Sequence, residues 1–246
     1  MTSSEIRVGV DIGGTFTDVA LQCPNGLHTG KVLTDYSEPE KAILQGIEMA
    51  AELAGVALSG IGQVIHGTTL VTNALIQRQG ARMAFITTEG FRDVIEMRSE
   101  NRFEQYDLNL ELPKPLVARQ DRFTLNERIG PKGEVLLALD PDEAREMAAR
   151  VVAGGYEAVA IGLMHAYAND AHERMMADAL RTVSPGLSVS ISSVISPQMR
   201  ELPRFNTVIA NAYVQPQVSA YLARLVGRLR EVGIEAPVFL MHSGGG

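Results

Sequence analysis

The chain has 246 residues, with 22 Lys and Arg against 29 Asp and Glu, a formal net charge of −7, and a single cysteine, Cys23. A chain of this length forms one large domain or one and a half ordinary ones. Its acidic balance argues against nucleic acid or an anionic membrane as the main partner, because both require a basic surface. A lone cysteine excludes an intramolecular disulfide and fits a reducing compartment. The sequence shows neither a signal-peptide pattern nor an apolar run of membrane-span length, so we expect a cytoplasmic protein.

The first predicted elements form an antiparallel meander. Apolar residues alternate along 6–12, 16–21 and 27–33, which predicts three strands. Pro24-Asn25-Gly26, between the second and the third, is typical of a hairpin turn. The segment 37–40 fits a capping box with a proline in the first turn, so we expect a helix to follow it.

The rest of the chain alternates helices and strands, apart from one charged, Pro-rich segment at about 89–135 that predicts a functional insertion or subdomain. Gly80 is the expected stop of one helix, Asp140 the expected N-cap of another, and Pro216 is expected to break or kink a third. In chain order we expect a strand at 63–66, a helix at 70–79, a strand at 83–87, a helix at 140–153, a strand at 158–164, a helix at 170–183, a strand at 187–191, a long helix at 202–232 and a strand at 237–241.

The segment Asp11-Ile12-Gly13-Gly14-Thr15-Phe16-Thr17-Asp18 is the strongest candidate for a phosphate-binding turn. Two glycines let the backbone turn tightly and bring N–H groups close to phosphate oxygens. Thr15 and Thr17 add hydroxyl donors, and Asp11 can hold a magnesium ion through water. A plain hairpin would require neither an aspartate before the glycines nor threonines after them.

A second candidate lies at His66-Gly67-Thr68-Thr69-Leu70-Val71-Thr72-Asn73-Ala74. A strand that ends at His66 and a helix that begins near Leu70 place two threonines at a helix N-terminus, where free N–H groups favour an anion. The alternative is that a threonine is only an N-cap and His66 is a core residue. A histidine, two threonines and Asn73 meet at one turn, which favours a functional site.

Two charged stretches are candidates for a pocket that binds a carboxylate or an amide. The first is Gly90-Phe91-Arg92-Asp93, within the motif Thr88-Glu89-Gly90-Phe91-Arg92-Asp93, with Arg98 and Arg102 after it. The second contains Arg119, Arg122, Glu127 and Arg128 and ends in the motif Glu127-Arg128-Ile129. The alternative is a solvated loop with local ion pairs that contribute little. The residues alone leave both interpretations open.

Other polar residues are expected to have structural roles. Arg200, Glu201 and Arg204 stand at helical spacing, which predicts that they pair with one another. His165 and His172 are expected to be surface residues.

Taken together, these motifs resemble the hydantoinase A/5-oxoprolinase family, which includes acetone and acetophenone carboxylase subunits and belongs to the actin-like ATPases. The resemblance implies an α/β fold, namely a ribonuclease-H-like/actin-like ATPase domain with a mixed sheet flanked by helices, plus an inserted subdomain. It also implies that residues 1–195 form the N-terminal actin-like domain, and that 196–246 begin a second, hydantoinase A domain that is truncated here.

The resemblance implies roles for individual residues. Asp11, His66, Thr68 and Thr69 are the expected catalytic residues, and Asp11 is also the expected magnesium ligand. The expected ATP-binding residues are Gly13, Gly14, Thr15 and Thr17, with Ser243, Gly244 and Gly245 as a second phosphate loop. Arg92, Arg128 and Asn73 are the expected substrate contacts, with Arg128 the strongest because the Glu127-Arg128 pair belongs to the resemblance.

The function that the resemblance implies is an ATP-dependent hydrolase subunit, with ATP and Mg2+ as cofactors. It would activate a hydantoin, 5-oxoproline or another lactam by phosphorylating its carbonyl oxygen. A ketone carboxylase subunit, a small-molecule or sugar kinase, and a non-enzymatic nucleotide-binding module remain alternatives. A B-type hydantoinase subunit is the expected partner, in an oligomer, and the chain alone is expected to be inactive.

Overall fold

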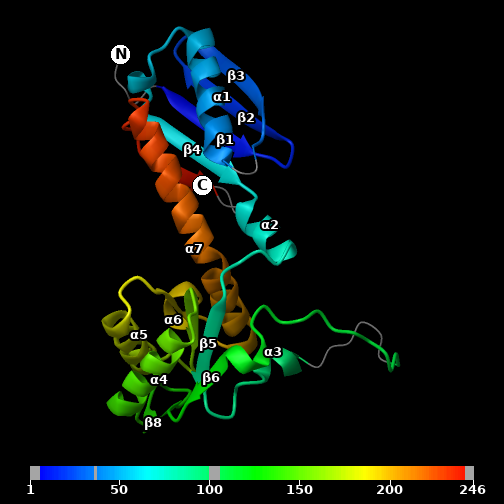
Figure 1. Ribbon diagram of the computed structural model, residues 1–246, viewed down its shortest axis with the longest axis vertical. Coiled ribbons are helices and arrows are strands. Elements are labelled where there is room, and N and C mark those ends of the chain that lie inside the picture. Colours follow the sequence, from blue (N-terminus) through cyan, green and yellow to red (C-terminus); the bar gives the residue numbers. More distant parts are fainter. Residues whose placement is uncertain (1–5, 36–37, 100–105, 242–246) are drawn as a thin grey trace. The chain divides into compact units, whose positions relative to one another are not determined.

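The computed structural model describes residues 6–35, 38–99 and 106–241. The chain divides into two compact units, of which the first consists of Met1–Asn73 with Val218–Gly246 and the second of Ala74–Gln217 (Figure 1). The first unit is therefore discontinuous in sequence, and the second is inserted between its two parts. The expected domains, 1–195 and 196–246, divide the chain differently and stay a prediction.

The first unit contains a mixed five-stranded sheet in the order β11-β4-β1-β2-β3. Its first three strands run antiparallel to one another, while β4 is parallel to β1 and β11 is parallel to β4. This arrangement confirms the predicted meander and the ribonuclease-H-like mixed sheet. The strands are β1 (Arg7–Ile12), β2 (Phe16–Cys23), β3 (Gly26–Leu33), β4 (Gln63–Thr68) and β11 (Val238–Met241).

One face of this sheet carries the core of the first unit. Alternate residues such as Val8, Val10 and Leu21 are buried there, since successive strand residues point to opposite faces. Helix α1 (Pro39–Ala54) packs on this face (Figure 1). Its Gly46 permits a close approach, because a Cβ at that position would lie 2.5 Å from the Val19 side chain. The last turns of α7 (Glu201–Glu231) pack into the same core. Two short elements complete the first unit, namely α2 (Leu70–Ile76) and the 3-10 helix η2 (Leu58–Gly60).

The second unit contains a four-stranded parallel sheet in the order β10-β9-β5-β6. Helices α4 and α5 cover one of its faces. The first turns of α7 cover the other, where the Phe205 and Phe85 ring centroids lie 5.3 Å apart. A Cβ at Gly162 would lie 2.6 Å from the Phe205 ring, so glycine is required for this approach. The elements are β5 (Met83–Thr88), β6 (Arg122–Leu125), β9 (Ala158–Gly162), β10 (Ser188–Ile191), α4 (Pro141–Ala153) and α5 (Ala171–Val183).

The charged segment near 89–135 is partly built into this sheet. Strand β6 pairs with β5, so that part of the segment belongs to the core of the second unit. The remaining elements are α3 (Val94–Met97), η3 (Arg119–Asp121), the hairpin of β7 (Arg128–Ile129) and β8 (Val135–Leu137), and, after β10, α6 (Ser192–Ile195).

Several helix boundaries differ from the sequence predictions. Helix α2 ends at Ile76, and Arg78 takes the left-handed conformation expected near a helix end, with φ 58°. Gly80 serves another purpose, because a Cβ there would lie 2.2 Å from the Tyr213 ring. Pro216 lies inside an unbroken helix. Ser37, the first residue of the predicted capping box, lies outside the described residues, and Glu40, its fourth residue, pairs with Arg224.

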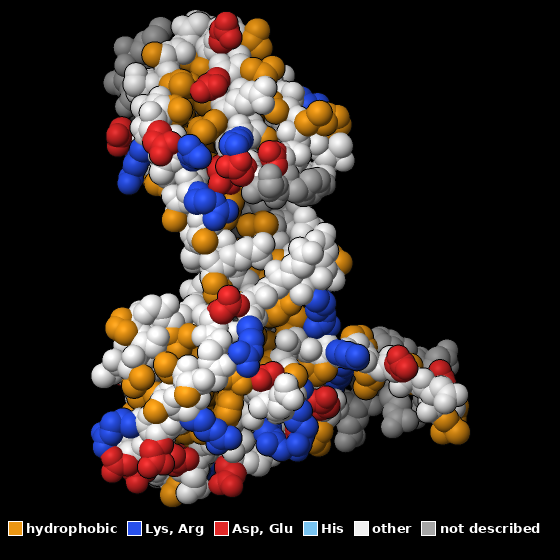
Figure 2. All heavy atoms as spheres, viewed as in Figure 1, with side chains coloured by type: hydrophobic (Ala, Val, Ile, Leu, Met, Phe, Trp, Pro, Cys, Tyr) orange, Lys and Arg blue, Asp and Glu red, His pale blue; other side chains and the backbone are white. Residues whose placement is uncertain are grey.

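The predicted N-cap of α4 is confirmed, since the Asp140 side chain accepts a hydrogen bond from the Asp142 N–H at 2.8 Å. On the face shown in Figure 2, acidic and basic side chains lie beside one another. Ion pairs between exposed side chains, such as Arg228–Glu231, occur within single helices. Among the residues that the structure describes, no helix is both long and apolar enough to cross a bilayer.

Candidate functional site

The predicted phosphate turn links β1 to β2, and hydrogen bonds from Thr34 stabilise it. The Gly13 N–H donates to the Phe16 carbonyl at 3.0 Å, which closes the turn. Thr34 donates its N–H to the Thr15 carbonyl at 3.0 Å and its hydroxyl to the Gly13 carbonyl at 3.1 Å. A Cβ at Gly13 would lie 2.9 Å from the Phe16 oxygen, so only glycine fits.

The outer residues of the turn present unused donors. Gly14 and Thr15 are exposed. Within the described part of the chain, their N–H groups donate to no protein acceptor. Two successive free N–H groups in a turn form a concave site for an anion. Thr17 is fully buried and its hydroxyl lies 3.1 Å from that of Thr34, so in this structure it supports the turn from inside.

Several of the expected site residues meet at a small cavity of about 70 Å³ in the first unit. This volume is roughly that of two water molecules. Thr68 caps α2, since its hydroxyl accepts from the Leu70 N–H at 3.1 Å, and Asn73 donates to the Thr69 hydroxyl at 3.3 Å. The cavity is lined by Ile12, Gly13, Thr34, Pro39, Thr68, Thr69, Leu70, Asn73 and Tyr221.

His66 lies beneath this cavity and is fully buried. Its Nε2 is 2.8 Å from the hydroxyl of Tyr221. Burial lowers the pKa of His66 more than the nearby charge of Asp11 raises it, which favours a neutral imidazole. Burial also raises the pKa of Tyr221, so the neutral phenol is the donor and Nε2 the acceptor. The structure thus places His66 behind Tyr221 and away from solvent, and its expected catalytic part stays a prediction.

Tyr221 was missed by sequence reasoning. It stands four residues before Leu225 and eight before Leu229, which are also buried. This spacing is that of an ordinary core stripe on a helix, so no local signal distinguishes the tyrosine. Beside it, Arg224 donates to the buried Glu40 carboxylate at 2.8 Å.

Asp11 lies on the other face of the sheet from the cavity. It is exposed, and it stands opposite Asp18 of β2 and next to Gly67 of β4. A Cβ at Gly67 would lie 3.2 Å from the Asp11 carboxylate, so glycine leaves room for it. Asp18 forms an ion pair with Lys31, in which Lys31 Nζ lies 2.7 Å from Asp18 Oδ1. These residues line a hollow of about 610 Å³ on that face, together with Gly9, Val10, Val19, Ala20, Thr29, Gly30, Ile65 and Met241.

The predicted magnesium site depends on Asp11, and the predicted second phosphate loop on Ser243, Gly244 and Gly245. Within the described residues, no group of three or more His, Cys, Asp or Glu side chains could hold a metal ion. Asp11 forms no hydrogen bond or ion pair within the same residues, which suits a cation held by one carboxylate and water. Ser243, Gly244 and Gly245 lie outside the described residues.

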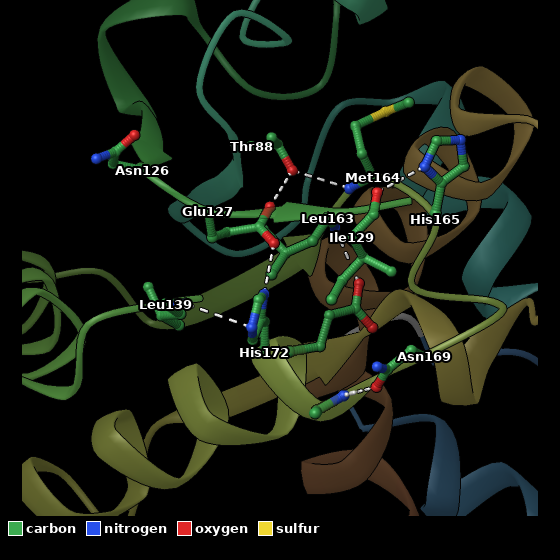
Figure 3. Close-up of polar contacts among 12 residues, drawn as sticks. Thr88, Asn126, Glu127, Ile129, Leu139, Leu163, Met164, His165, Asn169 and His172 are labelled. Atoms are coloured by element: carbon green, nitrogen blue, oxygen red, sulfur yellow. Dashed lines mark hydrogen bonds and ion pairs between the residues drawn. The ribbon is translucent and has the colours of Figure 1, made fainter. Parts of the chain in front are cut away.

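The second unit contains a buried polar cluster that sequence reasoning also missed. Thr88 donates its hydroxyl to one oxygen of Glu127, and His172 Nδ1 lies 2.7 Å from the other oxygen (Figure 3). The Leu139 N–H donates to His172 Nε2 at 3.3 Å, so the imidazole proton is on Nδ1 and points to Glu127. The Met164 N–H donates to the Thr88 hydroxyl at 2.9 Å. We call Thr88, Glu127 and His172 the buried clasp.

The expected surface positions of the two histidines are wrong. His172 is 5% exposed because it belongs to the clasp, and His165 is half-buried with its Nδ1 2.7 Å from the Ile129 carbonyl. The expected pairing of Arg204 along its helix is also wrong. Arg204 is 1% exposed, and it donates to the Ser192 hydroxyl and to the Leu163 and Gln198 carbonyls.

Two of the expected substrate contacts, Arg92 and Arg128, lie in the second unit and are half-buried. Arg128 stacks on Phe91, with its guanidinium carbon 4.7 Å from the ring centroid. The third, Asn73, lies at the cavity of the first unit. The structure therefore brings Gly13, Thr68, Thr69 and Asn73 to one cavity and leaves Arg92 and Arg128 with the other unit.

The mixed sheet with its glycine turn and flanking helices defines an α/β domain of the ribonuclease-H-like class, and comparison with known proteins identifies the family within this class. An uncharacterized protein of Methanocaldococcus jannaschii is 35% identical over 98% of the chain, which covers 35% of that protein. A 5-oxoprolinase of Saccharomyces cerevisiae is 31% identical over the whole chain, which covers 22% of it. The crystal structure of an ATP-dependent caprolactamase from Pseudomonas jessenii is 27% identical and superimposes with a TM-score of 0.87, over 96% of this chain and 35% of that one.

The family model described as the hydantoinase/oxoprolinase N-terminal region matches residues 7–184, and the chain belongs to this family. The resemblance that the sequence motifs indicate is confirmed. The chain spans about a third or less of the length of the relatives that it matches.

Proposed function

We propose that this chain carries the nucleotide-binding part of an ATP-dependent hydrolase that acts on a cyclic amide. The observation that carries the proposal is the β1–β2 turn, where Gly14 and Thr15 present free N–H groups and Gly13 admits no side chain. Membership of the hydantoinase/oxoprolinase family supports it. Two relatives are named as enzymes of lactams, the 5-oxoprolinase and the ATP-dependent caprolactamase.

The chemistry follows from the poor reactivity of an amide carbonyl. Transfer of the γ-phosphoryl group from ATP to the amide oxygen leaves ADP and makes that oxygen a phosphate ester. Water then adds to the carbon and the carbon–nitrogen bond breaks, so the ring opens to an amine and an acyl phosphate. A second water hydrolyses the acyl phosphate and releases the open amino acid and phosphate. Such transfers depend mainly on positioning and on stabilising charge on the phosphoryl oxygens. We assign the N–H groups of Gly14 and Thr15 to that stabilisation.

We assign supporting roles to the threonines at the cavity, to Asp11 and to His66. Thr68 and Thr69, at the cavity beside Gly13, stand near the group that is transferred. Asp11 would hold Mg2+ through water, and the ion would neutralise charge on the phosphates. His66 positions Tyr221 at the same cavity. A B-type companion subunit, an oligomeric assembly and a cytoplasmic location complete the proposal.

The test is ATP hydrolysis by the protein with its companion subunit, with and without 5-oxoproline, hydantoin or caprolactam. We expect at least one lactam to stimulate turnover, and we expect Asp11→Asn and Gly13→Ala to abolish it. Asp178→Asn is the matched control, because that carboxylate is exposed on α5 and, among the described residues, its one ion pair is with Arg181. Turnover that responds to a sugar and to none of these cyclic amides would reject the proposal.

A further inference from the structure

A segment of the second unit, residues 106–112, has the alternation of a β-strand but belongs to no sheet. It reads Tyr-Asp-Leu-Asn-Leu-Glu-Leu, so apolar side chains alternate with polar ones. Tyr106 is 91% exposed and Leu108 is 97% exposed. Within the described residues, the one hydrogen bond of the segment is local, from the Asn109 N–H to the Asp107 carboxylate at 2.8 Å. Large apolar side chains grouped in water mark a site of interaction. We call residues 106–112 the arm.

The arm is fixed at its base and projects from the second unit. Arg98 donates to the Pro113 carbonyl, and Arg78 donates to the Lys114 carbonyl at 2.6 Å. Figure 1 shows the arm extending beyond α3, and Figure 2 shows hydrophobic and acidic side chains at its tip. The tip is therefore held away from the unit that carries it and is accessible to another molecule.

The free edge of β10 is a complementary acceptor. Within the described residues β10 pairs with β9 alone, so its other edge presents unpaired N–H and C=O groups. The strand reads Ser-Val-Ser-Ile, without the charges or the proline that commonly protect an edge. Beside it lies a cavity of about 300 Å³, which is lined by β10, by Arg174 and Arg181 of α5, and by Val194 and Ile195 of α6. We call this cavity the β10 groove.

The charges of the arm and of the β10 groove match in sign and spacing. Asp107 and Glu111 lie on one side of an extended arm, about 13 Å apart. Arg174 and Arg181 lie two helical turns apart on α5, a separation of about 10 Å that their long side chains can adjust. Each arginine also pairs with an aspartate three or four residues before it. Such surface pairs contribute little, so each guanidinium keeps donors for a second carboxylate.

The other side of the arm is apolar, with leucines at 108, 110 and 112. At the β10 groove, Val194 is 58% exposed and Ile195 is 37% exposed. An extended segment that joins a sheet edge gains affinity from main-chain hydrogen bonds and specificity from alternate side chains. The arm on β10 would place carboxylates towards the arginines of α5 and cover apolar surface of α6 with leucines.

The arm of the same copy is badly placed for this groove. It belongs to the connection from β5 to β6, whereas β10 is the opposite edge strand of the sheet. Three strand spacings, about 14 Å, separate β6 from β10. Crossing that distance takes at least four of the seven arm residues at about 3.3 Å each, which leaves too few to pair with β10. The occupant is therefore the arm of a second copy.

We propose that the arm of one copy adds as a strand to β10 of a second copy, with Asp107 and Glu111 paired to Arg174 and Arg181. A two-fold axis makes the exchange reciprocal, so each dimer contains two contacts between an arm and a groove. This inference names the surface for the oligomeric assembly of the proposed function, and the contact itself requires neither nucleotide nor lactam.

The test is sedimentation equilibrium of the full chain without ligands. We expect a reversible dimer with a dissociation constant on the order of 10–100 µM, because two short added strands form a small interface. The arm variant, Asp107→Lys with Glu111→Lys, should dimerise at least about tenfold more weakly, since it sets like charges against each other. Glu48→Lys with Glu52→Lys is the matched control, because these exposed glutamates of α1 have the same spacing and undergo the same change of charge. It should dimerise like the unchanged chain.

A charge exchange tests the contact directly. The groove variant, Arg174→Glu with Arg181→Glu, should also fail to dimerise, with its fold checked by circular dichroism. An equimolar mixture of the arm variant and the groove variant should recover dimers, because both contacts in the mixed dimer then join opposite charges. The same recovery is expected when the four substitutions are combined in one chain. A groove variant that does not fold leaves the arm variant and its control to decide.

Three outcomes overturn the proposal. They are a chain that stays monomeric throughout the concentration range, an arm variant that dimerises like the control, and folded variants that fail to recover dimers when mixed. An arm variant that loses only the companion subunit would make that subunit the occupant and would also overturn it. Lactam-stimulated ATP hydrolysis is measured separately. Its absence rejects the proposed function and leaves the dimer contact standing, whereas its presence without dimers rejects the contact alone.

Discussion

The hydroxyl of Tyr221 donates a hydrogen bond to Nε2 of His66 across 2.8 Å, inside the core of the first unit. The two rings are tilted by 46° with their centroids 5.7 Å apart. His66 comes from β4, before the candidate helix N-terminus, and Tyr221 comes from α7. Their bond ties the end of β4 to α7, directly below the cavity that Thr68 and Thr69 line.

Replacement of Tyr221 by phenylalanine should destabilise the protein by about 1–3 kcal/mol, because it leaves the buried His66 without its donor. Urea unfolding followed by circular dichroism measures this. Tyr167→Phe is the control, since the Tyr167 hydroxyl has no hydrogen bond within the described residues. Equal stability of the Tyr221→Phe variant and the unchanged chain would show that the bond contributes nothing.

The burial of His66 predicts a pH dependence of stability. Its pKa in the folded state is lowered from 6.5, so the unfolded chain binds the proton more readily. Stability from this residue is therefore present above about pH 6.5 and is lost as pH falls through the lowered folded value. His66→Gln keeps an acceptor for Tyr221 but does not titrate. The free energy of unfolding should fall less between neutral and acidic pH in this variant, and an unchanged slope argues against the assignment.

A methyl group at Gly80 should not be tolerated. In Gly80→Ala the new Cβ would lie 2.2 Å from the Tyr213 ring, so the ring or the backbone must move. We expect a loss of about 1–3 kcal/mol, the usual cost of overpacking. Gly186→Ala, where a Cβ meets open space, is the matched control. Tyr213→Leu should relieve most of the loss in the double variant, and failure of that rescue would point to another cause.

Thr34 should matter for the phosphate turn although it lies outside the motif. Its hydroxyl donates to the Gly13 carbonyl and contacts the Thr17 hydroxyl, each at 3.1 Å. Thr34→Val removes both contacts and should cost about 1–2 kcal/mol of stability. It should also weaken ATP binding measured by calorimetry on the full protein. Thr182→Val, at an exposed position of α5 in the second unit, is the control. Unaltered ATP binding in Thr34→Val would mean that the turn needs no support from this side.

Much of the fold could be predicted from local patterns. The meander, the strand that ends in the His66 segment and the cap at Asp140 are confirmed, because alternation, a turn dipeptide and a capping aspartate each act within a few residues. The family could be predicted for the same reason, since its motifs are short and continuous. The predictions that failed concern residues whose partners are distant in sequence. Glu40 meets Arg224, and His172 meets Glu127, so neither could be placed from its neighbours alone.

The sequence by itself determined the strand and helix types, the glycine turn and the family, because each depends on residues close together in the chain. Only the tertiary structure decided which polar groups are buried, exposed or free. It placed Asp11 and Thr68 on opposite faces of one sheet, set Tyr221 behind the cavity, and stacked Arg128 on Phe91. These outcomes depend on how strands and helices far apart in sequence come together, and the free energy of burying a polar group is known only once its surroundings are.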